Sequence, residues 1–188
     1  VALPAAQYQS PESVQAFWRE IQRRVNGLPG VTAASMFTGM PPIRPLNAND
    51  TMIEGYVQKQ CGPPQNIDYY QIVGDKFFES LGIPLAEGRF LDARDGAGAP
   101  GAVVVNQTMA KMYYGGESAL GRRIRPSGGQ DWMTIVGVVA DVKNAGLDKP
   151  AGTELFFPVA QSGGVGRGGY IALRAAGDPM QLARAVRA

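Results

Sequence analysis

Glycine and proline interrupt this sequence so often that the chain is restricted to short helices and strands joined by many turns. There are 25 glycines and 14 prolines among the 188 residues, which exceeds average usage. Proline fixes its own φ and lacks an amide donor, and glycine readily adopts turn conformations. The segment 39–50 contains three prolines and one glycine. We therefore expect it to be a loop.

One segment, from Pro11 to Asn26, predicts a longer helix. Ser10 or Ser13 can cap its first turn, and the Gly-Leu-Pro-Gly sequence at 27–30 should end it. Apolar side chains recur at helical spacing, whereas charged side chains fall mostly on the other side. The apolar residues are Val14, Phe17, Trp18, Ile21 and Val25. We expect this stripe to face the core.

The rest of the pattern alternates short strands with short helices, which is typical of an α+β protein. The apolar run 135–139 predicts a strand buried on both faces. Asn106 is placed to cap a helix over 107–114, and Asp178 and Pro179 are placed to begin the last helix. A further short helix is expected over 75–81. Strands are expected at 31–37, 51–58, 68–73, 102–105, 121–125, 132–139, 154–159 and 170–174.

The composition excludes several classes of function. A net charge of +2, without a basic stripe, does not favour a nucleic-acid partner. The chain has no histidine and a single cysteine, Cys61, so it lacks an internal disulfide and the common zinc ligand sets. The absence of histidine also removes the usual general base of hydrolases. We therefore expect no catalytic residues, no metal site and no cofactor site, and we interpret Cys61 as an incidental thiol in a loop.

Two motifs that could carry chemistry are better explained by structure. Residues 164–169 match G-x-G-x-x-G, but a β-rich segment follows them where a dinucleotide site needs a helix. We interpret this motif as a connection between strands. Glu87, Asp92 and Asp95 lie near one loop without the spacing of a calcium site, so we expect solvated loop charges. Asp141 and Asp148 are interpreted as turn residues.

Methionine and aromatic side chains gather around the proline-rich loop and offer a possible contact surface. Core packing is the leading explanation for such residues, but methionine and aromatics are also enriched in interfaces. If this region contacts a partner, the loop between Gly39 and Asp50 is the leading candidate. The candidate partner-contact residues are Met36, Phe37, Met40, Ile43, Arg44 and Leu46.

An ordered series of segments spanning nearly the whole chain carries a family resemblance. These segments are Phe17-Trp-Arg-Glu-Ile with Leu28-Pro-Gly-Val31, Phe77-Phe-Glu-Ser-Leu-Gly-Ile-Pro-Leu with Gly88-Arg-Phe, Val103-Val-Val-Asn-Gln-Thr-Met-Ala with Tyr113, Leu120-Gly-Arg-Arg-Ile, Trp132-Met-Thr-Ile-Val-Gly-Val-Val-Ala-Asp-Val142 and Glu154-Leu-Phe-Phe-Pro158. In order and spacing they resemble the MacB-like periplasmic core domain of MacB/FtsX-type ABC-transporter permeases. The style is most similar to the large permeases of acidobacteria.

The resemblance implies a two-part architecture. Residues 1–60 and 166–188 would form a porter-like α/β subdomain, and residues 61–165 would form an inserted, strand-rich, sabre-like subdomain. It also implies an extracytoplasmic position between the first two transmembrane helices of the permease. We accordingly expect the chain, which opens on Val1 and stops at Ala188, to be an excised fragment. Family domains usually continue into a further strand, so the porter sheet is expected to lack a strand or to expose an edge.

The implied function is mechanical. ATP would be hydrolysed on a separate cytoplasmic ATPase subunit or domain, and the permease, expected to be a homodimer, would transmit the motion outward to a periplasmic adaptor or another envelope protein. Two alternatives stay open. A small-ligand or peptide-binding sensor domain would be favoured by an apolar pocket between the subdomains. A hydrolase using Asp or Lys would require two converging carboxylates in a cleft.

Overall fold

The computed structural model describes residues 1–58 and 65–187. Cys61, interpreted above as an incidental thiol, lies outside the described residues. Within the described part, no helix combines the length and the apolar character that crossing a bilayer demands.

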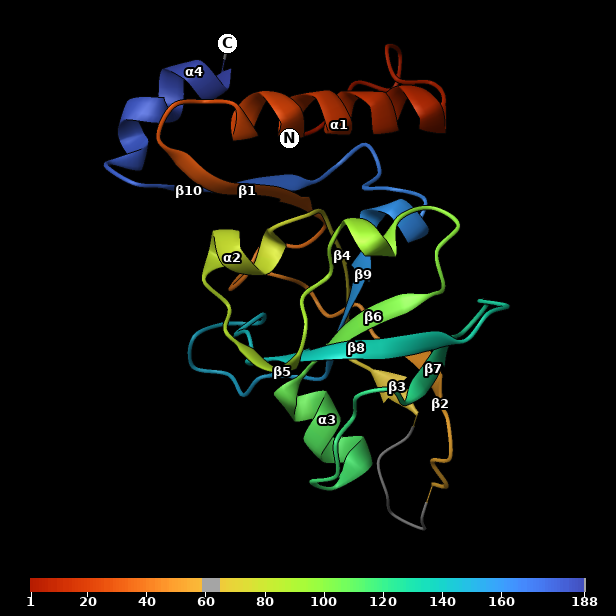
Figure 1. Ribbon diagram of the computed structural model, residues 1–188. Helices are drawn as coiled ribbons and strands as arrows, with labels where there is room; N and C mark the ends of the chain where they lie inside the picture. The colour runs from red at the N-terminus through yellow and green to blue at the C-terminus, as the bar shows by residue number, and fades with distance from the viewer. Residues whose placement is uncertain (59–64, 188) are drawn as a thin grey trace.

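Helix α1 (Pro11–Asn26) lies across one end of the molecule, over strands β1 (Val31–Phe37) and β10 (Tyr170–Ala175) (Figure 1). Its predicted bounds are confirmed, and Ser10 is its N-cap, because the Ser10 hydroxyl accepts the amide of Ser13 at 3.2 Å. Trp18 anchors the buried side of the helix. Its side chain is 1% exposed and its Nε1–H donates to the carbonyl of Gly166 at 2.9 Å.

Ten strands form one mixed sheet in the order β10-β1-β4-β9-β6-β8-β7-β2-β3, with β5 pairing β8 outside this path. The pairs β4–β9 and β6–β8 are parallel, and the other pairs are antiparallel. Every residue of β6 and β9 is buried, which places these two strands at the centre. The remaining bounds are β2 (Asn49–Ile53), β3 (Asn66–Ile67), β4 (Tyr69–Val73), β5 (Leu85–Gly88), β6 (Ala102–Asn106), β7 (Arg123–Pro126), β8 (Met133–Val139) and β9 (Glu154–Pro158).

Three apolar clusters fill the space between the sheet and its helices. The first lies under α1, the second under α2 (Phe77–Leu81), and the third under α3 (Gln107–Tyr114). As predicted, Asn106 caps α3 by accepting the amide of Met109 at 3.0 Å. The chain also contains the 3-10 turns η1 (Ala93–Asp95), η2 (Val159–Gln161) and η3 (Pro179–Leu182), and it ends in α4 (Ala183–Arg187).

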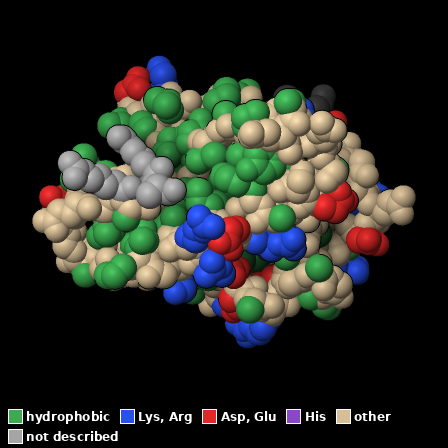
Figure 2. Space-filling model, turned by 90° about the horizontal axis from the view of Figure 1, so that it is seen from above, with side chains coloured by type: hydrophobic (Ala, Val, Ile, Leu, Met, Phe, Trp, Pro, Cys, Tyr) green, Lys and Arg blue, Asp and Glu red, His purple; other side chains and the backbone are tan. Residues whose placement is uncertain are grey.

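The α1 and α4 end of the molecule carries apolar side chains beside a charged cluster (Figure 2). On α1, Glu20 forms ion pairs with Arg23 at 2.8 Å and Arg24 at 2.7 Å. A shallow cavity of about 640 Å³ lies between α1 and α4. The N-terminus and helix α4, the last described element, both lie on this side of the molecule (Figure 1).

One strand was missed, and two local predictions were wrong in extent. Strand β5 was not expected, because Leu-Ala-Glu-Gly has little strand character; it forms because Gly88 lies opposite Gly137, where a Cβ on Gly137 would approach the Arg89 carbonyl oxygen to 2.1 Å. The strand expected at 51–58 is instead β2, which ends at Ile53. The last helix begins as the 3-10 turn η3 before continuing as α4, although Asp178 caps it as predicted.

The prediction that Asp95 is a solvated loop charge was wrong. Its side chain is buried and forms two hydrogen bonds, each of 2.7 Å, with Arg89. It also accepts the amide of Asp92 in a capping box that closes η1. The Arg89 guanidinium lowers the pKa of the Asp95 carboxyl. The carboxylate therefore fixes the loop that leads into β6.

The division into residues 1–60 with 166–188 and residues 61–165 stays a prediction. The sheet runs through both parts, and its narrowest point lies between β1 and β4, which share the single pair Phe37 and Val73.

Candidate functional site

The proline-rich loop after β1 is held against the sheet by buried polar groups. The Gln71 side chain on β4 donates to the carbonyl of Gly39 at 2.8 Å. Farther along the loop, the Arg44 amide donates to the carbonyl of Asn144 at 2.9 Å, and the Asn47 amide donates to the carbonyl of Asp68 at 3.1 Å. These attachments give a segment without helix or strand a defined conformation.

The strongest attachment is a buried ion pair between Arg44 and Glu154, the first residue of β9. The Arg44 Nη1 lies 2.5 Å from the Glu154 Oε1, and the two side chains are 4% and 2% exposed. Arg44 also donates to the carbonyl of Tyr70, and its guanidinium lies over the Tyr69 ring at 5.0 Å. The other Glu154 oxygen accepts from the Asn144 side chain at 2.9 Å. The pair thus joins three segments that are distant in sequence.

Burial has the largest effect on the pKa of both partners. It lowers the pKa of the Arg44 guanidinium and raises the pKa of the Glu154 carboxyl to about 7. The mutual attraction and the hydrogen bond from Asn144 oppose these shifts. Because desolvating two ions is expensive, such a pair adds little net stability, whereas removal of one partner alone leaves an uncompensated buried charge.

The six predicted contact residues separate into buried and exposed groups. Met36 and Phe37 are buried in β1, Met40 packs partly buried against the core under α2, and Arg44 is buried as described. Ile43 and Leu46 are 78% and 66% exposed. The loop therefore places Arg44 inside and Ile43 and Leu46 outside, and of the six only Ile43 and Leu46 can meet a partner without rearrangement.

A third exposed aliphatic residue, Leu147, was not predicted. It is 79% exposed and lies on the loop that follows β8. Asn144 connects this loop to the Arg44 loop through the hydrogen bonds given above. One sequence signal could have revealed this network: Glu154 begins an otherwise apolar segment, and a carboxylate in a buried strand needs a partner.

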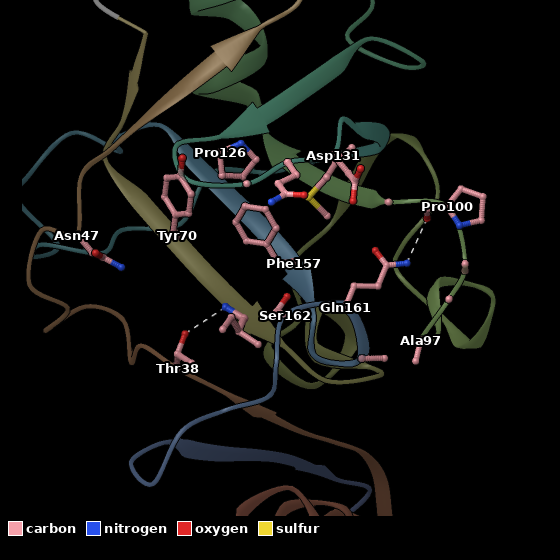
Figure 3. A pocket seen from close by; sticks show the side chains of 18 residues that line it. Thr38, Asn47, Tyr70, Ala97, Pro100, Pro126, Asp131, Phe157, Gln161 and Ser162 are labelled. Carbon is pink, nitrogen blue, oxygen red and sulfur yellow. Dashed lines mark hydrogen bonds between the residues drawn. The ribbon is translucent and has the colours of Figure 1, made fainter. Parts of the chain in front are cut away.

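A cavity of about 930 Å³ lies on one face of the sheet (Figure 3). Its floor comes from β4, β8 and β9, where the rings of Tyr70 and Phe157 stack at 5.3 Å. Its walls are residues 97–101 before β6 and the turn between β7 and β8. We call this space the sheet-face cavity. Sequence reasoning did not find it, because its walls come from segments far apart in the chain.

The remaining candidates for chemistry have structural roles. The glycine-rich segment 164–169 packs on Trp18, where a Cβ on Gly169 would meet the indole ring at 3.1 Å. Asp141 accepts the amide and the hydroxyl of Thr108, each at 2.8 Å, at the start of α3. Among the described residues, no group of three or more Cys, Asp or Glu side chains could hold a metal ion.

Solved structures share this fold. The periplasmic region of MacB from Actinobacillus actinomycetemcomitans is 16% identical, with a TM-score of 0.62 over 89% of this chain and 70% of that one. The extracellular domain of the noncanonic ABC-type transporter YknZ from Gram-positive bacteria is 14% identical, with a TM-score of 0.59 over 90% and 78%. A domain of a putative permease from Porphyromonas gingivalis is 19% identical, with a TM-score of 0.52 over 87% and 70%.

A family comparison goes further than the fold. The family described as MacB-like periplasmic core domain matches residues 4–188. No curated protein matches the chain, and the comparisons do not support the expected acidobacterial affiliation. Domains of this family are non-catalytic, periplasmic or extracellular parts of ABC-transporter permeases. The chain belongs to the MacB-like periplasmic core domain family.

Proposed function

We propose that this domain transmits ATP-driven motion of its permease to a partner in the envelope. The observation that carries the proposal is the continuous ten-stranded sheet, which connects the α1 and α4 end to the α3 end. The N-terminus and α4 lie on the same side of the molecule (Figure 1). Permease helices joined on that side would move it first, and a sheet whose central strands β6 and β9 are fully buried would carry the displacement to the far end.

Fluorescence in the full-length permease with its ATPase, reconstituted in nanodiscs, tests this proposal. A dye on Lys111→Cys reports the distance from the α3 end to labelled lipid headgroups, and a dye pair on Glu12→Cys and Lys111→Cys reports the length of the domain. All variants carry Cys61→Ser, which leaves the introduced cysteines as the labelled ones in this domain. Addition of ATP should change the first distance and leave the second constant, as expected for rigid-body motion. An unchanged distance to the membrane would contradict transmission, and a changed domain length would contradict rigidity.

We further propose that the partner contact lies on the loop that carries Ile43 and Leu46. The support is that this loop exposes its aliphatic side chains Ile43 and Leu46 and buries Arg44. Exposed aliphatic side chains on a fixed backbone suit a contact with an apolar surface. A periplasmic adaptor is the partner that the resemblance implies. The loop lies away from α1 and α4, so it is free to meet another protein while the permease homodimer that we propose forms at its membrane helices.

Site-specific photo-crosslinking in the full-length permease tests this contact. A benzoylphenylalanine at position 43 or 46 should crosslink to one envelope protein, identified by mass spectrometry. The same group at Val57, which is 81% exposed on another part of the surface, is the matched control. Equal crosslinking from position 57 would contradict a specific contact at this loop.

The alternative of a small-ligand or peptide-binding sensor has one observation in its favour, the sheet-face cavity. Binding there does not exclude transmission, because the cavity leaves the central strands of the sheet paired.

A further inference from the structure

The floor of the sheet-face cavity is apolar and aromatic. Phe157 and Tyr70 lie side by side at its centre (Figure 3), with their ring planes inclined by 26°. Ile72 and Met133 extend this floor along the neighbouring strands. The volume of about 930 Å³ lies within the range of sites for small organic molecules, and such sites are lined mostly by apolar side chains with a few polar groups.

The walls are held in place by hydrogen bonds within the chain. The Gln161 side chain accepts the amide of Ala102 at 3.0 Å and donates to the carbonyl of Pro100 at 3.1 Å, which fixes one wall. The Thr38 hydroxyl accepts the amide of Ile72 at 3.1 Å, and the Tyr70 hydroxyl is hydrogen-bonded to Thr51. A site with its walls and floor already ordered loses less conformational entropy when it binds a ligand.

The charge of the lining selects the ligand. Among the described residues that line the cavity there is no lysine or arginine, and the one carboxylate is that of Asp131 in the turn between β7 and β8. Asp131 forms no hydrogen bond or ion pair with any residue in the described part of the chain. The arginine nearest to Asp131 in the sequence is Arg125 on β7. Its guanidinium lies over the Trp132 ring at 5.3 Å, and it does not line the cavity. A carboxylate and two aromatic rings favour a positive charge, and the described lining holds no cationic side chain that would pair with an anion.

We propose that the sheet-face cavity binds small amphipathic organic cations. The apolar body of the ligand lies on the rings of Tyr70 and Phe157, and its positive group lies toward Asp131. The side chains of Gln161, Asn47 and Thr38 border the space and give it a polar rim. Cation binding in the sheet-face cavity is independent of the proposed transmission of ATP-driven motion. Either proposal can be contradicted while the other remains valid.

Two ions of the same shape and opposite charge test the proposal on the 188-residue chain. Tetraphenylphosphonium and tetraphenylborate are titrated separately while the methionine methyl groups, labelled with carbon-13, are followed by NMR. The Met133 methyl in the cavity floor should shift saturably with the phosphonium ion and not with the borate. The methyl of Met180, which is 73% exposed on η3, is the internal control and should not move.

Two matched variants locate the charge. Asp131→Asn should weaken binding of the phosphonium ion by about threefold to fivefold, as expected for an exposed charge interaction. Asp148→Asn removes an exposed carboxylate from a different loop and should leave the affinity unchanged. Equal binding of the borate, an unmoved Met133 methyl, or an Asp131→Asn affinity equal to that of the parent chain would each overturn the proposal.

Discussion

Replacing Arg44 by methionine should lower the free energy of unfolding by about 3–5 kcal/mol near pH 8, because it leaves the buried Glu154 carboxylate without its cation. Methionine keeps much of the apolar volume of the arginine stem. The loss of stability is therefore due to the missing positive charge and not to a cavity. The Arg44 guanidinium is also the link between the proline-rich loop and the carbonyl of Tyr70. Urea unfolding, followed by far-UV circular dichroism, measures the effect.

The pH dependence separates a lost ion pair from a general packing defect. Burial already raises the pKa of Glu154 to about 7 from a reference value of 4.5, and removal of Arg44 takes away an opposing charge. A carboxyl with a raised pKa in the folded state binds its proton more tightly there, so its contribution to stability falls as the pH rises through that pKa. The destabilisation of Arg44→Met should therefore be smaller at pH 5 than at pH 8.

A double variant provides the control. Arg44→Met with Glu154→Gln removes both charges and retains a side chain that can hydrogen-bond Asn144. It should recover part of the stability lost in Arg44→Met and show little change between pH 5 and pH 8. A pH-independent loss in Arg44→Met, with no recovery in the double variant, would show that the ion pair does not hold this loop.

The same ion pair shows where sequence reasoning reached its limit. Local signals predicted the bounds of α1, β1 and α3, because caps, apolar spacing and glycine stops act within a few residues. The partner of Arg44 lies 110 residues away, and the Asn144 loop that completes the network lies in a third segment. Such contacts depend on which strands become neighbours, which no local pattern specifies. The predicted loop was therefore found, and the burial of its arginine was not.

Strand β5 and the sheet-face cavity were missed for a related reason. The residues of β5 are exposed and have weak strand propensity, so the strand exists because it pairs with the end of β8, beyond the two β8 residues that pair with β7. The cavity depends on β4 lying in one sheet with β8 and β9, although β4 is distant from both in the chain. In both cases tertiary pairing, rather than local preference, determines the structure.

Replacing Phe156 by alanine should lower the free energy of unfolding by about 3–5 kcal/mol, the range for a fully buried phenylalanine. Phe156 is 1% exposed on the central strand β9, and its ring packs against those of Phe78 at 5.1 Å and Phe77 at 5.9 Å. The neighbouring strands β4 and β6 pair with β9 on either side, so they restrict how far the site can collapse around the missing ring. Urea unfolding measures the loss.

Its neighbour Phe157 is the matched control, because adjacent residues of a strand point to opposite faces of the sheet. Phe157 lines the sheet-face cavity and stacks on Tyr70, so one part of its surroundings is already empty. Phe157→Ala should therefore cost less than Phe156→Ala, since fewer packing contacts are lost. It should also weaken binding of tetraphenylphosphonium, whereas Phe156→Leu, which retains most of the buried volume, should not. If both alanine variants lost the same stability, the two faces of β9 would be packed alike, and the cavity would not be a preformed space in the folded chain.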